Sequence, residues 1–389
     1  GEIPAWGFGR RLILQEGGEG MNEPIFIARQ DTLEQEILPA HWLSQYKLFG
    51  EESYTFQDKE IWKRLCMSRA AANDRDMHAE ALEEMLTTFS AEHTGKWMLT
   101  VYGMDAAVLE GLATMAAVAG NGTAMAAVAG NALLMHAITN SETAMQAISR
   151  SQTAMQRIAN SATAMDAISG NKIARGAVQA SPYYNSYIKE NDMAIAKLVV
   201  SFANLASAGY SGMAGVAADA TAMNAVAASS TAMNAVAASS TAMTAVAASG
   251  VALKAIAQAY KKTANMLQFL KAVNASDTLV KRIYSTLTNA TALFGAAQLG
   301  SQDSVENANS WATTSAAPNA FLACACGYYG SSSDSVSVTY NGTVIAQKKT
   351  GTAKPGSVTS TNVNAITMAP STFTENGDGY LAVQKFTAK

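Results

Sequence analysis

TAMNAVAASS, the sequence of residues 221–230, recurs unchanged at residues 231–240. Looser copies extend this unit in both directions, with Val or Ile three residues after a methionine that returns every ten residues. These methionines are Met115, Met125, Met135, Met145, Met155 and Met165 in a first block, then Met213, Met223, Met233 and Met243 in a second. Such a regular period indicates a tandem array in which each unit packs on its neighbours.

A period of ten residues does not fit one continuous α-helix. Each residue turns by about 100°, so the Met and Val face would drift by roughly 80° per repeat. A β-solenoid would place Met and Val on opposite faces, and Ala and Asn are poor strand formers. We therefore expect one helix of about two turns per repeat, with Met, Val and Ala inside and a Ser or Thr hydroxyl as cap.

Helices this short are unstable alone, so neighbouring repeats must bury each other's apolar faces. The sequence thus predicts a short-helix ten-residue repeat solenoid over residues 103–260, with the methionines as core and not as metal ligands. Residues 181–210 interrupt the period, and a helix is expected within them at 193–205. Residues 261–310 keep a looser helical pattern and are expected to form a helical connector.

Residues 1–100 have a different composition from the repeats. They contain four of the five tryptophans and carry 10 basic and 17 acidic residues. Helical patterns at residues 55–72 and 74–91, with strand structure before Gly20 and around residues 25–28, predict a mainly helical N-terminal domain. The first twenty residues lack a signal-peptide pattern, and no uninterrupted run of large apolar residues is long enough for a membrane span.

The C-terminal region predicts β-structure. Alternating residues at 335–340, the pair Asn341-Gly342 and the strand pattern at 343–347 predict a β-hairpin. Further strands are expected at 358–368 and 380–386. We expect residues 311–389 to form a small antiparallel β-sandwich, which makes the whole chain a multidomain α+β protein.

The same region supplies the candidate ligand residues. Aromatic rings stack on sugar rings, and carboxylates accept hydrogen bonds from hydroxyl groups or bind Ca²⁺. The candidates are Tyr328, Tyr329, Tyr340, Tyr380, Asp334 and Asp378. Packing inside the sheet is the alternative interpretation of each tyrosine.

Signals for catalysis are weak. Asp74 and His78 share one face of an expected helix, but a solvated acidic face explains them without a metal. Cys66, Cys324 and Cys326 give neither a disulfide framework nor a zinc-ligand set, so neither metal nor cofactor is expected. No nucleophile elbow, phosphate-binding loop or basic stripe for nucleic acid occurs. These patterns favour a structural or binding protein over an enzyme.

The repeats TAMQAISRSQ (143–152) and TAMDAISGNK (163–172) resemble those of bacteriophage tail fibre and related virion proteins. The resemblance covers about residues 103–178 and 211–258. It implies a virion structural protein of a tailed phage, made in the host cytoplasm, most simply a tail fibre or appendage subunit. Residues 1–100 would then dock on other virion proteins, and residues 311–389 would contact a host glycan or protein. A homo-oligomer, preferably a trimer, is expected.

The repeats differ from those of many phage fibres in one respect, and they also allow an alternative function. They are helical in character, whereas many phage fibres have β-structured shafts. A cell-surface adhesin or an ice-binding solenoid would show a similarly regular Thr, Ser and Ala surface, in which Thr221, Thr231 and Thr241 form a rank.

Overall fold

The computed structural model describes residues 12–14, 26–28, 114–287, 290–292, 309–313, 320–328, 335–349, 363–368, 371–376 and 379–387. This part of the chain is mainly helical, with sixteen α-helices and antiparallel strands in small sheets. It belongs to two compact units, residues 1–183 and residues 184–389. The helices expected at 55–72 and 74–91 lie outside the described residues.

The first unit contains one short helix per repeat, as predicted. Its helices are α7 (Met115–Gly120), α8 (Gly122–Gly130), α9 (Ala132–Thr139), α10 (Glu142–Ser149), α11 (Gln152–Ala159), α12 (Ala162–Gly170) and α13 (Lys172–Gln179). Strand β1 (Leu12–Leu14) pairs antiparallel with β2 (Phe26–Ala28), which confirms a strand near residues 25–28.

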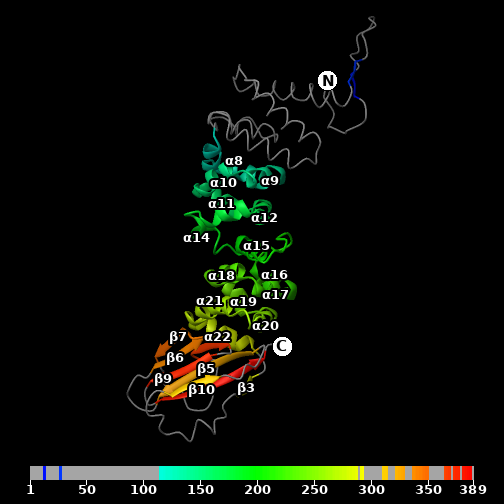
Figure 1. Ribbon diagram of the computed structural model, residues 1–389. Coiled ribbons are helices and arrows are strands. Elements are labelled where there is room, and N and C mark those ends of the chain that lie inside the picture. The colour runs from blue at the N-terminus through cyan, green and yellow to red at the C-terminus, as the bar shows by residue number, and fades with distance from the viewer. Residues whose placement is uncertain are drawn as a thin grey trace, which may run out of the picture. The chain divides into compact units, whose positions relative to one another are not determined.

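The second unit continues with short helices and ends in strands (Figure 1). Its helices are α14 (Tyr184–Tyr187), α15 (Asp192–Phe202), α16 (Met213–Ala218), α17 (Ala220–Ala228), α18 (Ser230–Ala238), α19 (Ser240–Ala247), α20 (Gly250–Gln258), α21 (Thr263–Asn274) and α22 (Asp277–Thr286). Figure 1 shows the short helices of each unit lying one above another.

A polar side chain caps the start of nearly every repeat helix. The Ser161 hydroxyl, for example, accepts a hydrogen bond from the Ala164 N–H at 3.2 Å. Asn121 and Asp219 use their side-chain oxygens in the same way at the starts of α8 and α17. The predicted hydroxyl cap is therefore confirmed for serine, and short Asn and Asp side chains do the same work in other repeats because their oxygens reach the same N–H groups.

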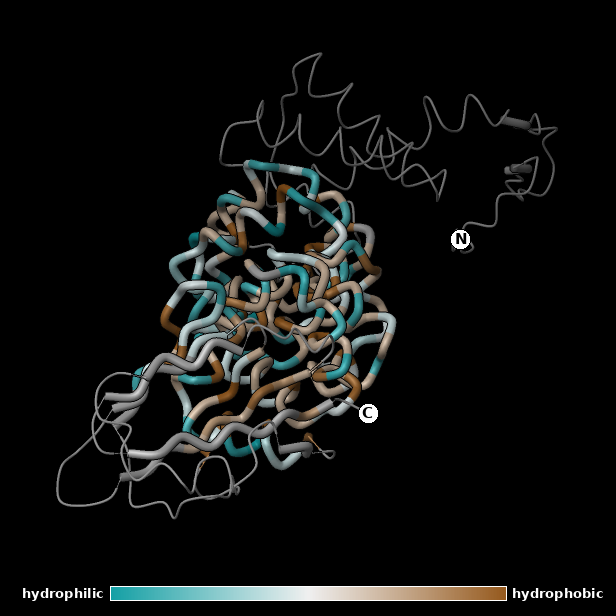
Figure 2. Tube along the Cα trace, turned by 60° about the horizontal axis from the view of Figure 1, so that its bottom comes forward, coloured by the Kyte–Doolittle hydropathy of each residue, from teal (hydrophilic) through white to brown (hydrophobic). Residues whose placement is uncertain are grey.

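The inner face of each repeat is buried as the period predicts. Met155 and Ile158 of α11 are fully buried, and so are Met233 and Val236 of α18. Figure 2 shows the apolar stretches returning at short intervals along the coiled tube. Small alanines beside these residues let helix backbones approach closely, and the unbranched methionine fills the irregular space that remains.

Contacts within each unit join helices three apart in the chain. In the first unit α7 contacts α10, α8 contacts α11 and α9 contacts α12; in the second α16 contacts α19 and α17 contacts α20. Serine hydroxyls at helix starts also reach back to the end of the fourth helix before. Ser151, which starts α11, donates to the Ala119 carbonyl of α7 at 2.6 Å, and Ser249, which starts α20, donates to the Ala217 carbonyl of α16 at 2.5 Å, each across 32 residues. These bonds satisfy carbonyls that a helix C-terminus leaves without an internal partner.

The interruption at 181–210 includes a helix that packs like a repeat. Helix α15 contacts α18, the third helix after it, as well as α16 and α17. It ends at Phe202, three residues before the predicted end at 205, and Asn204 then adopts the left-handed conformation (φ 60°). Asn tolerates this conformation better than most residues, so it ends the helix.

The expected helical connector over 261–310 is wrong at residues 290–292 and 309–310, which form strands. Strand β3 (Ala290–Ala292) pairs with the end of β10 (Gly379–Thr387), and β4 (Asn309–Thr313) pairs with β9 (Ser371–Asn376). Both segments are held by partners about 60 to 90 residues later in the chain. The local sequence therefore carries little sign of them.

The remaining strands form two four-stranded antiparallel sheets, ordered β3-β10-β5-β8 and β4-β9-β6-β7. The predicted hairpin is confirmed: β6 (Ser335–Tyr340) pairs with β7 (Thr343–Lys349) through Asn341 and Gly342, which both have positive φ as a two-residue hairpin turn requires. Strand β8 (Ala365–Met368) covers only the end of the strand predicted at 358–368. Strands β5 (Ala320–Tyr328) and β9 were not predicted.

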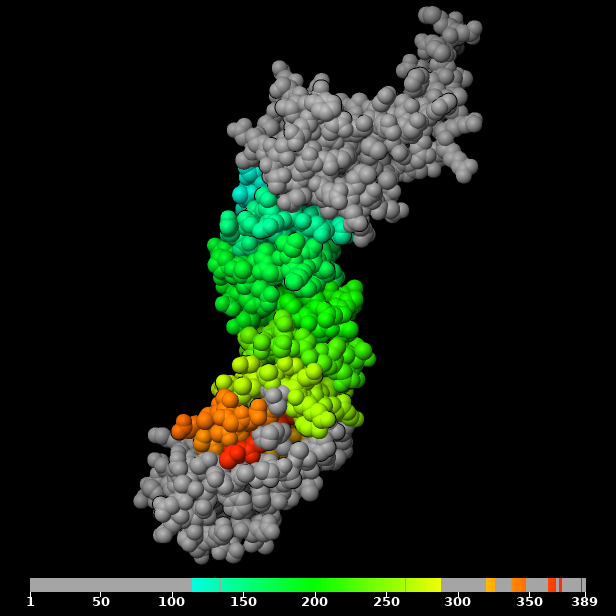
Figure 3. Space-filling view, viewed as in Figure 1, coloured from blue at the N-terminus to red at the C-terminus, as the bar shows by residue number. Residues whose placement is uncertain are grey.

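Helices α21 and α22 pack on these strands, as Figure 3 shows for the surface where α21 meets the hairpin. Asn274 makes the most specific link: its side-chain amide donates to the Ile366 carbonyl at 2.8 Å and accepts from the Ile366 N–H at 3.0 Å. This pair of bonds imitates a neighbouring strand and covers the edge of β8. Tyr284 also packs edge-on against Phe386, with ring centroids 5.1 Å apart.

Among the described residues no single helix is long and apolar enough to cross a membrane. Helices α19 and α20 pass that test of length and composition only as a pair, bent by 95°.

The paired serines between repeats allow a matched test of the cap. Ser229 accepts from the Ala232 N–H at 3.2 Å and donates to the Phe202 carbonyl at 2.8 Å, whereas the neighbouring Ser230 is exposed on the first turn of α18. We expect Ser229→Ala to lower the free energy of unfolding by about 1 to 2 kcal/mol, because it removes both bonds. Ser230→Ala should change it by less than about 0.5 kcal/mol. Urea unfolding of both variants measures the difference, and equal effects would contradict the assignment.

Candidate functional site

The structure places two of the six predicted ligand residues, Tyr328 and Tyr380, at the same end of one strand pair but on opposite faces of the sheet. Tyr328 ends β5 and pairs with Gly379 in the register, while Tyr380 pairs with Gly327, so both tyrosines lie at the same end of the β5–β10 pair. Directly paired residues share a face of the sheet, and consecutive residues on a strand lie on opposite faces. Tyr380 therefore shares a face with Gly327, and Tyr328 lies on the other face. Tyr329, Asp334 and Asp378 lie outside the described residues.

Tyr340 lies apart from these two residues, at the end of β6 in the other sheet. Its side chain is fully buried, and its hydroxyl has no hydrogen-bond partner among the described residues. Burial raises the pKa of Tyr340 to about 12. A ring enclosed in this way has no face for stacking on a sugar, so Tyr340 acts as core in this structure.

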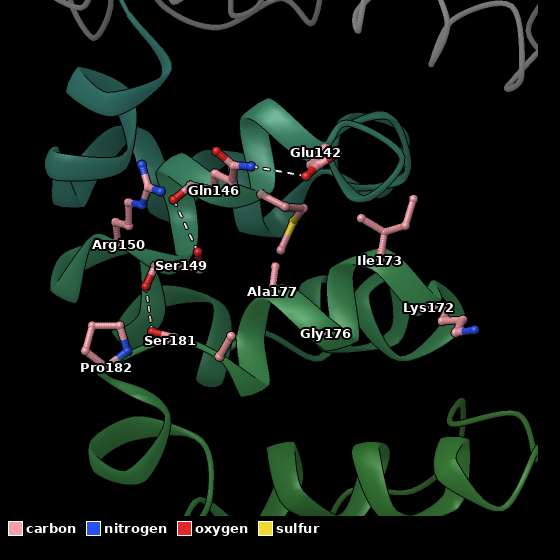
Figure 4. A pocket seen from close by; sticks show the side chains of 12 residues that line it. Glu142, Gln146, Ser149, Arg150, Lys172, Ile173, Gly176, Ala177, Ser181 and Pro182 are labelled. Atoms are coloured by element: carbon pink, nitrogen blue, oxygen red, sulfur yellow. Dashed lines mark hydrogen bonds between the residues drawn. The ribbon is translucent and has the colours of Figure 1, made fainter.

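A groove lies on the outside of the first unit, between α10 and α13 (Figure 4). Its volume is about 770 Å³, within the range of sites that hold ligands or the side chains of a partner. Small residues on α13 form one wall, namely Gly176, Ala177 and Ala180, and Met145 and Gln146 of α10 face them. Hydrogen bonds support the α10 side: the Gln146 amide donates to Glu142 at 3.2 Å, and Ser181 donates to the Ser149 carbonyl at 2.5 Å.

The two ends of the groove differ in charge. Glu142 and Lys172 start α10 and α13, whereas Arg150 lies at the C-terminal end of α10, with Pro182 nearby in the view of Figure 4. All three charged side chains are exposed. The groove therefore has apolar residues along its length, a carboxylate and an ammonium group at one end and a guanidinium group at the other.

A second cluster surrounds Glu190, an exposed residue of the second unit just before α15. Its carboxylate accepts hydrogen bonds from the N–H groups of Ser240 and Thr241 at 3.1 and 3.0 Å, and from their hydroxyls at 2.8 and 3.1 Å. These groups start α19. The negative charge thus satisfies N–H groups at a helix N-terminus, where the helix dipole also favours an anion.

The environment of Glu190 sets the pKa of its carboxyl group. Partial burial raises this pKa, but the hydrogen bonds from Thr241 and Ser240 together lower it below its usual range. Burial raises the pKa of Tyr184, and the nearby Glu190 charge raises it further. The carboxylate is therefore ionised near neutral pH and holds the segment before α15 on the start of α19.

A similar link joins α15 to α16. The Asp192 carboxylate accepts from the Met213 N–H at 2.8 Å. A Cβ on Gly212 would overlap the same carboxylate, so a larger residue there would displace Asp192. Sequence analysis marked this segment as an interruption but could not find either link, because Glu190 and Asp192 bind residues 50 and 21 positions away.

No group of three or more His, Cys, Asp or Glu residues that could hold a metal occurs in the part of the chain that the structure describes. Asp74 and His78 lie outside that part. Cys324 of β5 is buried, as expected for a structural thiol. The chain matches no protein-family model and no curated protein sequence.

The Glu190 cluster predicts an acid-sensitive contribution to stability. The folded-state pKa of Glu190 lies below its unfolded value, so its contribution is present at neutral pH and is lost as the pH falls through the folded-state pKa, below about 4.3. We expect Glu190→Gln to lower the free energy of unfolding by on the order of 1 kcal/mol at pH 7, since exposure screens these bonds. The difference from the natural chain should shrink towards pH 3. Urea unfolding at both pH values measures it, and a difference independent of pH would exclude the ionised carboxylate as its source.

Proposed function

We propose that this chain is a structural protein of a tailed-phage virion, a subunit of a tail fibre or appendage. In this proposal the repeats act as a spacer between a docking region at residues 1–100 and a contact region at residues 311–389. One observation carries the spacer role. The repeat helices use their apolar faces and their cap hydroxyls to bind other repeats, so these groups are already occupied within each unit.

The proposal includes a short-helix solenoid with about three helices per turn. Contacts between third neighbours support it. So do serine-to-carbonyl bonds that span 32 residues, made by Ser151, Ser161 and Ser181 in the first unit and by Ser249 in the second. Three ten-residue repeats make 30 residues per turn. The serine bonds span 32 residues because each acceptor carbonyl lies two residues before the position that is one full turn earlier. Regular stacking of this kind gives each added repeat the same set of contacts, which suits a part that sets a distance.

The proposal also treats the two C-terminal sheets as a β-sandwich that contacts a host glycan or protein. Contacts between β9 and β10, and between β6 and β8, support face-to-face packing of the sheets. Tyr328 and Tyr380 are the two ligand candidates at the same end of the β5–β10 pair, and each lies on a different face of its sheet. Within the virion the chain would act as a homo-oligomer, preferably a trimer, after synthesis in the host cytoplasm. Catalysis has no role in this proposal.

The helix arrangement favours the fibre over the ice-binding alternative. Thr221, Thr231 and Thr241 lie on the successive helices α17, α18 and α19, whereas stacked neighbours are three helices apart. A flat rank of threonines would require repeats one apart to stack directly. The adhesin alternative keeps the same spacer geometry and differs only in where the protein is found.

Localisation tests the proposal. Antibodies raised against the full chain should label purified phage particles at the tail in immunogold electron microscopy, and mass spectrometry should find its peptides in those particles. Labelling of the surface of uninfected cells, with none on the particles, would support the adhesin and contradict the virion role.

A further inference from the structure

The outer face of α10 and α13 carries charged side chains that form no ion pair with other described residues. Glu142 and Arg150 lie at opposite ends of α10, eight residues or about 12 Å apart. Glu142 accepts a bond only from the neutral Gln146 amide, and Arg150 and Lys172 form no ion pair within the described part of the chain. One exposed helix therefore has a free anion at its start and a free cation at its end.

Ile173 follows Lys172 on α13, and its side chain is unusually exposed. Its side chain is 53% exposed, more than any other large apolar side chain among the described residues. The corresponding position is a threonine in the three repeats before the last helix, at Thr143, Thr153 and Thr163. An apolar side chain thus replaces a hydroxyl group on the surface of this repeat, next to the groove.

The groove beside Ile173 has room for a side chain from outside. A Cβ built on Gly176 would meet no atom within 4 Å, although glycine costs a helix interior up to about 1 kcal/mol relative to alanine. Ala177 and Ala180 extend the same low wall, and Met145 faces it. The face thus combines an apolar projection, an apolar recess and charges of both signs.

We propose that this face joins copies of the chain in a cyclic homo-oligomer, with Glu142 of each copy beside Arg150 of the next copy. The symmetry axis lies over the exposed side of α10 and is perpendicular to the axis of this helix. Rotation about it brings the C-terminal end of one α10 beside the N-terminal end of α10 in the next copy. The apolar Ile173 side chain then enters the recess over Gly176 of an adjacent copy. This inference rests on the homo-oligomer of the proposed function and assigns its contact surface.

Charge complementarity favours a second copy of this chain as the partner that binds the α10–α13 face. Both charges of the pair come from a single helix, so any copy turned by the symmetry operation supplies the opposite charge at the required place. An unrelated partner would have to bring an acidic and a basic group at a matching separation. Association of identical faces needs nothing beyond this chain.

Oligomeric mass of the full chain tests the contact. Sedimentation of the natural chain should give a small multiple of 40.6 kDa, and Ile173→Asp should raise the dissociation constant by about tenfold or more, because a buried apolar group becomes a charge. Val251→Asp is the matched control, since Val251 is 39% exposed and lies on α20. It should leave the mass unchanged.

Charge exchange tests the pairing of the two residues. Glu142→Arg and Arg150→Glu should each weaken association, and the double variant should restore it, because every copy then carries the reversed pair. Circular dichroism checks that each variant keeps its helices. Three results would each overturn the contact. They are a natural chain that stays a monomer at about 100 µM, where a contact with a micromolar dissociation constant would be almost fully formed, an Ile173→Asp variant as associated as the Val251→Asp control, and a double variant that remains dissociated. Immunogold labelling of particles would stand in all three cases, so failure of this contact is distinct from failure of the virion role.

Discussion

The serine hydroxyl at the start of a repeat helix makes the pair of bonds on which the helical part depends. Ser161 accepts a bond from the N–H of Ala164 in its own helix and donates one to the Ala129 carbonyl 32 residues earlier. A helix of eight or nine residues is marginal in water, so its ends and its apolar face both need partners from elsewhere. The same hydroxyl starts one helix and completes the end of another. At Ser151, Ser161 and Ser249 the ten-residue period keeps the hydroxyl within reach of its carbonyl.

The repeat helices could be predicted from sequence because their signals are local. Met155 and Ile158 are three residues apart on one helical face, and Ser151 precedes them at the cap, so ten residues contain the whole pattern. The hairpin at Asn341-Gly342 is similar, since the turn itself requires residues that tolerate positive φ. The stacking of third neighbours was not predicted. The sequence of a single repeat predicts which face of its helix is buried, but it does not predict which other helix covers that face.

The parts that sequence analysis missed depend on distant partners. Strand β5 reads AFLACACGY, a run of small and apolar residues with modest strand propensity, and it becomes a strand because β10 and β8 pair with its two edges. Glu190 looks like any surface glutamate until the fold brings it to the start of α19. Among the proposed ligand residues, Tyr340 was misleading for a related reason. Alternation places it on a face of β6, but only the second sheet and the helices determine that this face is inside.

Removal of whole and partial repeats tests the double role of the serine most directly. Deletion of residues 151–160 leaves Ser161 at 32 residues from Ala119, the spacing that Ser151 has in the natural chain. This ten-residue deletion should keep the helical circular dichroism per residue and lower the melting temperature by only about 5 °C. Deletion of residues 151–155 breaks the spacing and should abolish cooperative melting of the repeats. Equal behaviour of the two deletions, whether both harmless or both disruptive, would contradict a fold held in register by these bonds.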